Sequence, residues 1–132
     1  MREISNVNPP RLPKPVGYSH ATVAGELVFL GGQIGCDEGG RVTHPSDMAS
    51  QCRQAFRNLQ IALEAAGCRP ANVVKLTYFV TDVGAYKAVA PEVGAAYRAV
   101  FGKHYPASTL VEVKGLYEPD ALFEVECIAL RG

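Results

Sequence analysis

The chain has 132 residues, of which 48% are hydrophobic and 20% are charged, so it can bury a core without metal or disulfide support. Thirteen basic residues balance thirteen acidic ones, and neither sign gathers into a run. Proteins that bind nucleic acid usually concentrate lysine and arginine on one face, so a nucleic-acid partner is not expected. No apolar stretch is long enough to cross a bilayer, which also argues against a membrane partner.

The four cysteines are scattered along the chain, and no CxxC pair is present. They are Cys36, Cys52, Cys68 and Cys127. We expect reduced thiols that pack as small hydrophobic side chains, and no metal site, because the three histidines are isolated as well. The segment from Met1 to Ile4 lacks the charged and apolar regions of a secretory signal, which predicts a cytoplasmic location.

The N-terminal part of the chain holds a proline-rich segment, Pro9 to Pro15. Proline removes amide donors and fixes φ, so this segment cannot form a helix or a central strand. We expect residues 1–16 to form an extended arm, and a polyproline ligand for another protein is the alternative. Two strands are predicted next, at residues 18–23 and 27–34, joined by a tight turn at residues 24–26.

A helix is predicted from a cap at Ser46 or Asp47 to about Ala66, with Gly67 as its stop signal. Its apolar positions recur at three- and four-residue steps, which is typical of a helix with one buried face. These positions are Met48, Cys52, Phe56, Leu59 and Leu63. Residues 73–81 are rich in β-branched and aromatic side chains and are predicted to form a strand.

A second helix is expected between Asp82, which can cap it, and Gly102, with a kink or a restart at Pro91. Strands at residues 107–115 and 122–130 follow, separated by a turn. The order β-β-α-β-α-β-β, without a repeat or a linker, predicts a single α+β domain over residues 1–132. Both helices should cover the same face of the sheet.

The two faces of the predicted sheet differ in character. Alternate residues of the last strand form an apolar face that suits the helices: Phe123, Val125, Cys127 and Ala129. The opposite face is expected to mix apolar with acidic side chains: Leu110, Ile128, Leu130, Glu112, Glu124 and Glu126. Mixed surfaces of this kind are typical of interfaces and ligand clefts, so an oligomer of unspecified order is expected. A solvated antiparallel sheet face is the alternative.

A glycine-rich run, residues 31–35 (GGQIG), fits neither the P-loop nor the dinucleotide fingerprint. Adjacent glycines at a strand end let a ligand approach the backbone, or else allow close strand packing. Glu124 and Glu126 point the same way from one strand. Paired carboxylates in a partly buried cleft raise each other's pKa, which suits general acid-base catalysis on water. The alternative is that they pair with interface cations: Lys75, Lys114 and Arg98.

Several segments together resemble the Rid/YjgF family, which is also labelled endoribonuclease L-PSP or translation-initiation inhibitor. They stand in family order and cover nearly the whole chain after the first fifteen residues. The matching segments are residues 17–21 (GYSHA), 31–34 (GGQI), 54–59 (QAFRNL), 65–67 (AAG), 74–82 (VKLTYFVTD), 105–113 (YPASTLVEV) and 123–129 (FEVECIA).

The resemblance implies a chorismate-mutase-like fold of the bacillus type, in a homotrimer with a central barrel and a ligand cleft between neighbouring subunits. Family members hydrolyse enamines and imines to a 2-keto acid and ammonia, without a metal or an organic cofactor. In them a glutamate matching Glu124 positions or activates water, and a tyrosine matching Tyr18 lines the cleft from the neighbouring subunit. The resemblance therefore implies a hydrolase of the imine-deaminase type with catalytic Glu124 and Tyr18.

The family's carboxylate-binding arginine is replaced here by a serine, Ser108. The substrate-binding residues implied by the match are Gly31, Gly32, Gln33, Ser108, Thr109 and Leu110. A hydroxyl cannot replace a guanidinium with five donors. Either Lys75, Lys114 or Arg98 supplies the cation, or the substrate has no carboxylate at that end. The alternative functions are a non-catalytic trimer that binds a metabolite or a protein, and a ribonuclease, which the even charge balance disfavours.

Overall fold

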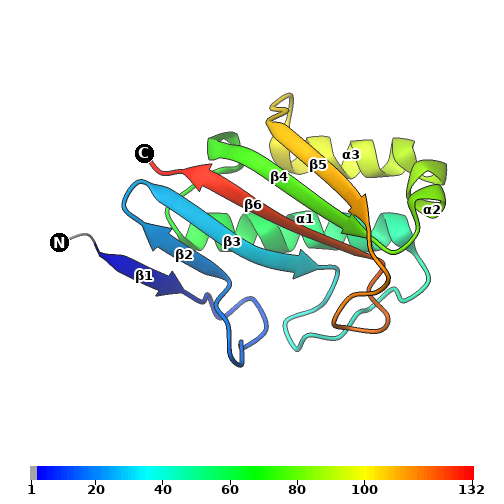
Figure 1. Cartoon of the computed structure of the whole chain (residues 1–132), viewed down its shortest axis with the longest axis horizontal. Helices are drawn as coiled ribbons and strands as arrows, with labels where there is room; N and C mark the ends of the chain where they lie inside the picture. Colours follow the sequence, from blue (N-terminus) through cyan, green and yellow to red (C-terminus); the bar gives the residue numbers. More distant parts are fainter. Residues whose placement is uncertain (1–2) are drawn as a thin grey trace.

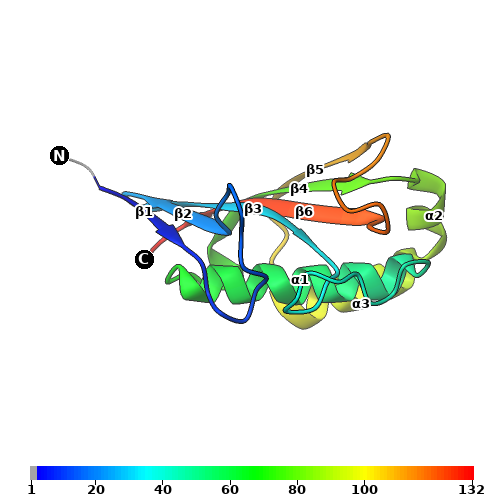
Figure 2. The same ribbon diagram turned by 90° about the horizontal axis from the view of Figure 1, so that it is seen from below.

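The computed structural model describes residues 3–132; Met1 and Arg2, which belong to the expected arm, lie outside the described residues. Six strands form one sheet in the order β1-β2-β3-β6-β4-β5, and α1 and α3 cover one face of it (Figures 1 and 2). The elements are β1 (Ile4–Val7), β2 (Ala21–Ala24), β3 (Leu27–Ile34), α1 (Met48–Ala65), η1 (Pro70–Asn72), β4 (Val73–Val80), α2 (Val83–Ala88), α3 (Ala90–Phe101), β5 (Ala107–Glu112) and β6 (Phe123–Leu130).

The N-terminal arm contains a strand, β1, that was not predicted from the sequence. β1 pairs antiparallel with β2 as an edge strand, with Ile4 opposite Ala24. Further along, Leu12 is only 3% exposed, and the carbonyl oxygen of Pro13 lies 2.7 Å from Nε2 of His20. The proline-rich segment is therefore packed against the sheet.

The long predicted helix is confirmed as α1, since its start and stop signals are local. Asp47 accepts a hydrogen bond from the amide of Ser50 at 3.0 Å, which satisfies one of the unpaired donors of the first turn. Beyond the other end, Gly67 adopts a φ of 82°, a conformation that favours glycine. Among residues 3–132, no helix is long and apolar enough to cross a membrane.

The predicted break at Pro91 is a restart rather than a kink. Asp82 caps α2 by accepting from the amide of Ala85 at 2.9 Å, and α2 ends at Ala88. α3 then begins at Ala90 with Pro91 in its first turn, where the missing amide would have no helical partner in any case. The chain thus has two helices in place of the single one predicted for this segment.

β6 is the strand that joins the two halves of the sheet, because it pairs antiparallel with both β3 and β4. β5 lies outside β4 and runs parallel to it. Parallel neighbours need a crossover connection, which α2 and α3 provide here. The predicted apolar face of β6 is confirmed: Phe123, Val125, Cys127 and Ala129 are at most 3% exposed and pack under the helices.

The face predicted for Leu110 and Glu112 is wrong. Residues directly opposite each other on paired strands point to the same side, and Leu110 lies opposite Tyr78, which is buried under the helices. Glu112 lies on that side too, where its Oε1 accepts from the amide of Val83 at 2.9 Å, at the start of α2. The alternation of side chains in an edge strand such as β5 defines two faces, but it does not tell which face the helices cover. The parallel pairing of β5 with β4 determines which face that is.

The core between the sheet and the helices is organised around Phe56 of α1, which is 1% exposed. Its ring makes edge-on contacts with aromatic rings from α3, β4 and β6, at centroid distances between 5.6 and 6.1 Å. These partners are Tyr78, Tyr97, Phe101 and Phe123. Aromatic pairs in this arrangement stabilise a core beyond the apolar area that they bury.

We expect Phe56→Ala to lower the free energy of unfolding by about 3–5 kcal/mol, because it removes a buried ring and leaves a cavity among four others. Chemical denaturation of the two proteins measures this difference. Tyr117→Ala is the matched control, since Tyr117 is 98% exposed and its loss should change the free energy by no more than about 0.5 kcal/mol. Equal losses in both variants would contradict the central role of Phe56.

Candidate functional site

A cavity of about 610 Å³ lies where β3 ends and β6 begins. Four of the residues predicted for the site line it together: Tyr18, Gly32, Gln33 and Glu124. Glu124 comes from the open face of β6, while Gly32 and Gln33 come from the end of β3. We call this space the Glu124 cavity.

The side chain of Glu124 lies against a place where the neighbouring strand has no side chain. The pairing of β3 with β6 shifts register between Leu30 and Gln33, so the extra residue of this bulge falls at Gly31 and Gly32. A Cβ atom on Gly32 would stand 2.5 Å from Cδ of Glu124, so the carboxyl group would have to move. Gly32 therefore gives Glu124 its position.

Another glycine of the same run serves packing instead. A Cβ atom on Gly35 would stand 2.6 Å from the backbone of Gln51, so Gly35 lets β3 leave the sheet in close contact with α1. Neither position matches the two interpretations of the run directly: Gly32 leaves room for the carboxyl group of Glu124, and Gly35 allows close packing against α1.

Burial raises the pKa of the Glu124 carboxyl group, and the negative charge of Glu126 on the same face raises it further. The cavity also contains one cation and a second carboxylate, Lys14 and Glu118. Burial is the larger cause that raises the pKa of Tyr18, and the electrostatic interaction with Cys36 raises it further. The hydroxyl of Tyr18 therefore stays protonated at neutral pH and can donate a hydrogen bond. The site therefore combines a carboxyl group that holds its proton more readily than usual with a neutral donor.

Two buried amide side chains on α1 fix the strand ends that carry the site. Gln51 donates to the carbonyl of Asp120 at 3.1 Å and accepts from the amide of Leu122 at 2.7 Å, which holds the approach to β6. Two turns further along α1, Asn58 donates to the carbonyl of Ile34 at 2.9 Å, at the end of β3. Because buried amides need such partners, α1 sets the distance between the two strand ends.

His20 forms the third buried polar group near the cavity, and it connects the arm to β3. Its Nδ1 lies 3.1 Å from Nε2 of Gln33, and its Nε2 lies 2.7 Å from the carbonyl oxygen of Pro13. The two contacts fit the neutral imidazole with its proton on Nε2. Its ring also meets Tyr18 edge-on, at a centroid distance of 5.4 Å, so His20 orients a predicted catalytic side chain.

Sequence reasoning did not place several residues of this cavity: Lys14, His20, Cys36, Tyr117 and Glu118. They come from the arm and from loops, whose approach to the strand ends depends on the tertiary fold. Burial raises the pKa of the Cys36 thiol to about 11, with Asp37 and Glu118 adding to the effect. Cys36 therefore remains a thiol at neutral pH, which does not suit a nucleophile. The four cysteines are all buried and free, as expected.

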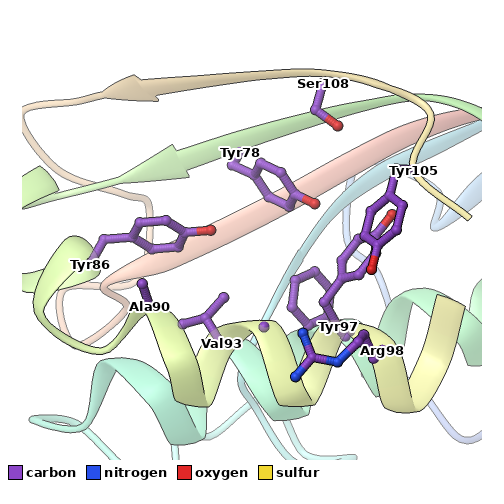
Figure 3. A pocket seen from close by; sticks show the side chains of 10 residues that line it. Tyr78, Tyr86, Ala90, Val93, Tyr97, Arg98, Tyr105 and Ser108 are labelled. Carbon is purple, nitrogen blue, oxygen red and sulfur yellow. The ribbon is translucent and has the colours of Figure 1, made fainter. Parts of the chain in front are cut away.

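The remaining predicted site residues lie elsewhere in the chain. Ser108 lines a second cavity, between the β4–β5 pair and the helices (Figure 3). Thr109 lies on the open face, where its Oγ1 accepts from Nζ of Lys75 at 2.6 Å. Leu110 packs against the edge of the core. Of the three cations considered for the carboxylate, Arg98 is the one that shares a cavity with Ser108.

The side chains of the Glu124 cavity do not form a metal centre. Among the residues that the structure describes, no group of three or more histidine, cysteine, aspartate or glutamate side chains could hold a metal ion. The chemistry of the site, as built, is that of a carboxyl group and hydroxyl and amide donors.

This sheet, helical layer and strand-end carboxylate define a class of small α+β proteins of the chorismate-mutase-like fold. The family described as "Endoribonuclease L-PSP" matches residues 11–131. The chain therefore belongs to the endoribonuclease L-PSP family, the Rid/YjgF family to which its segments are similar.

Individual relatives cover nearly the whole chain. The RutC family protein UK114 of Drosophila melanogaster is 37% identical over 120 residues, covering 90% of this chain and 83% of the relative. The 2-iminobutanoate/2-iminopropanoate deaminase of Escherichia coli is 36% identical and covers 90% and 91% of the two chains. The crystal structure of E. coli TdcF with bound serine has a TM-score of 0.82 at 29% identity, covering 97% and 99%.

We expect Glu124→Gln to raise the thermal midpoint near pH 7. A carboxyl group whose pKa is raised by folding stabilises the native state below its unfolded pKa, and this contribution is lost as the pH rises through the folded value. At neutral pH the wild type therefore carries the cost of a half-buried charge, which glutamine removes. The gain should fade below about pH 4, where both states of the wild type are protonated.

Differential scanning calorimetry from acid to neutral pH measures this gain. Glu38→Gln is the control, since Glu38 is exposed in the loop after Cys36. A pH-independent gain in Glu124→Gln, or the same gain in the control, would contradict the assignment of the raised pKa to Glu124.

Proposed function

We propose that the chain hydrolyses small imines or enamines to a carbonyl product and ammonia. The observation that carries the proposal is the carboxyl group of Glu124, held over Gly32 in a cavity that it shares with Tyr18. The name of the E. coli deaminase, 36% identical over nearly the whole chain, supports the same reaction class. The serine bound to E. coli TdcF supports a ligand of amino-acid size.

The reaction needs one water molecule and a group that moves a proton in both directions. Water adds to the carbon of the C=N bond, and Glu124 takes a proton from the water and delivers it to the nitrogen. The resulting carbinolamine gives its hydroxyl proton to Glu124, which delivers it to the amine nitrogen. Ammonia then leaves as the C–N bond breaks and the C=O bond forms. A raised pKa brings the carboxyl group of Glu124 nearer to neutral pH, where it can both accept and donate. Tyr18 donates a hydrogen bond to the oxygen or nitrogen that carries the developing charge.

The proposal includes a homotrimer with its cleft between subunits, because the open sheet face exposes a set of large apolar side chains. Each of them is 40–47% exposed: Leu27, Phe29, Val74, Val111 and Leu130. Large apolar side chains left exposed on one face are typical of an interface. Packing three open faces together would cover these side chains.

We expect sedimentation equilibrium of the purified protein to give a molar mass three times that of one chain, which is 14.1 kDa. Phe29→Glu should shift the protein towards the monomer, because it places a charge in the centre of the open face. Ala95→Glu is the matched control, since Ala95 is exposed on α3, away from the open face, and should leave the assembly intact. Sedimentation of the wild type as a monomer at micromolar concentration would contradict the trimer.

We expect the wild type to accelerate ammonia release from imines that an amino-acid oxidase generates, and Glu124→Ala to lose this effect by about 100-fold or more, as for a removed general acid-base. Gly32→Ala should also lose activity, since its Cβ atom occupies the space of the carboxyl group. Gly115→Ala is the control, because nothing lies within 4 Å of a Cβ atom there.

The pH dependence gives a second test of the same role. Glu126 raises the pKa of Glu124, so Glu126→Gln should move the acid limb of the rate profile to lower pH, while the maximal rate is retained. Equal rates in the wild type and Glu124→Ala would remove the catalytic role of Glu124. An unshifted acid limb would show that Glu126 does not act on it.

A binding protein without turnover is the second candidate, and the serine at position 108 favours it. The arginine expected at that position is absent, and the one cation among the described residues that lines the same cavity as Ser108 is Arg98, which belongs to a different element, α3. A ligand that raises the thermal midpoint by mass action while imines remain unconsumed would support this function. Ribonuclease activity is disfavoured, because the two carboxylates of the Glu124 cavity outnumber its one lysine and would repel phosphate.

A further inference from the structure

A second cavity, of about 270 Å³, separates the β4–β5 pair from α2 and α3. Four of the six tyrosines of the chain line it, and we call it the tyrosine cavity: Tyr78, Tyr86, Tyr97 and Tyr105. Tyr78 and Ser108 reach it from the sheet, while Tyr86, Val93, Tyr97 and Arg98 reach it from the helices (Figure 3). Its walls therefore offer aromatic faces together with hydroxyl groups.

The walls of the tyrosine cavity are held in place by contacts of their own. The hydroxyl of Tyr97 donates to the carbonyl of His104 at 2.6 Å, and the rings of Tyr97 and Tyr105 stack at 5.5 Å with a 10° interplanar angle. Tyr78 is anchored against Phe56. A site whose walls are fixed before binding loses little entropy when a ligand enters.

The electrostatics of the tyrosine cavity favour an anion. Among the ten described residues that line it, Arg98 is the only charged one, and none is acidic. Burial raises the pKa of Tyr97 to about 12 and that of Tyr78 still further, so both hydroxyls are neutral at physiological pH. The Glu124 cavity has the opposite character, with two carboxylates against one lysine.

Gly94 explains why Arg98 can serve this cavity. The two residues lie one turn apart on α3, and a Cβ atom on Gly94 would stand 3.2 Å from Nη1 of Arg98. The guanidinium therefore folds back along the helix over the glycine and stays beside the cavity. A guanidinium in such a position can pair with a carboxylate through two parallel hydrogen bonds.

We propose that the tyrosine cavity binds a carboxylate ligand that carries an aromatic or bulky apolar side chain, with the carboxylate on Arg98 and the side chain among the tyrosine rings. A cavity of roughly 150 Å³ is enough for benzene, so the tyrosine cavity has room for a ring and a short chain. Within residues 3–132, the tyrosine cavity shares no lining residue with the Glu124 cavity, so this ligand is a second ligand and not the substrate of Glu124. The inference therefore goes beyond the proposed function.

Binding is tested with three probes that separate charge from ring: 3-phenylpropanoate, propanoate and 3-phenylpropanamide. Calorimetry gives the affinities. Tyrosine fluorescence reports the location, because the chain has no tryptophan and most of its tyrosines line this cavity. We expect 3-phenylpropanoate to bind about tenfold or more tightly than either other probe, since each of them lacks one of the two interactions.

Two variants place the probe in the tyrosine cavity. Arg98→Gln should weaken 3-phenylpropanoate about tenfold and leave the amide unchanged. Ala90→Phe should weaken both phenyl probes by filling the space beside Tyr86. Arg57→Gln is the matched control, because Arg57 is exposed on α1 and lines neither cavity. Unchanged affinity in Arg98→Gln, or propanoate binding as tightly as 3-phenylpropanoate, would overturn the inference.

Turnover separates this inference from the proposed function. If imines derived from phenylalanine and alanine are hydrolysed but 3-phenylpropanoate does not bind, the hydrolysis stands and the binding site is wrong. If 3-phenylpropanoate binds through Arg98 and neither imine is consumed, the binding site stands and the hydrolysis is wrong. Binding of 3-phenylpropanoate that Arg98→Gln weakens, together with turnover of both imines that Glu124→Ala abolishes, supports the two together.

Discussion

The carboxyl group of Glu124 occupies a space that exists only because the adjacent strand lacks a side chain there. A bulge in the pairing of β3 with β6 places Gly32 beside it, and any larger residue would meet the carboxyl carbon at 2.5 Å. A half-buried acid is costly in its charged form, so such an arrangement needs firm support from its surroundings. The elements around the Glu124 cavity supply that support.

Most of this support comes from α1, on the far side of the sheet from the carboxyl group. Its apolar stripe packs the core, and its two buried amides hold the end of β3 and the approach to β6. The helix therefore does more than cover the sheet, because its polar residues set where two strands stop and start. The ring of Phe56 joins this frame to α3 and β4, so one core supports the walls of both cavities.

The parts of the fold that were predictable from sequence are those that local chemistry determines. Asp47 and Asp82 cap helices within three residues, and Pro91 restarts one within its own first turn. β1 was missed because three of its four residues are exposed, which leaves no alternating pattern to detect. The side on which Leu110 and Glu112 lie was missed for a different reason, since it follows from the parallel pairing with β4, which no local pattern encodes.

The site was predictable to the extent that its residues lie on regular strands. Glu124 and Gly32 could be placed from the pattern of β6 and β3, whereas His20 and Cys36 reach the cavity through loops and the arm. A signal for the supporting amides was present, because Gln51 and Asn58 fall among the apolar positions of α1, where a polar residue needs a buried partner. Such interruptions in an apolar stripe indicate which helix holds a site in place.

The position of β6 also constrains the order in which the molecule can form. β1, β2 and β3 make one group of strands, and β4 and β5 make another, yet no pairing joins the two until β6 enters between them. β6 follows all the other strands along the chain. During synthesis, β3 and β4 therefore each have an unpaired edge until β6 has been made. Glu124 lies on that same strand, so the pairing that completes the sheet also brings the carboxyl group into its cavity.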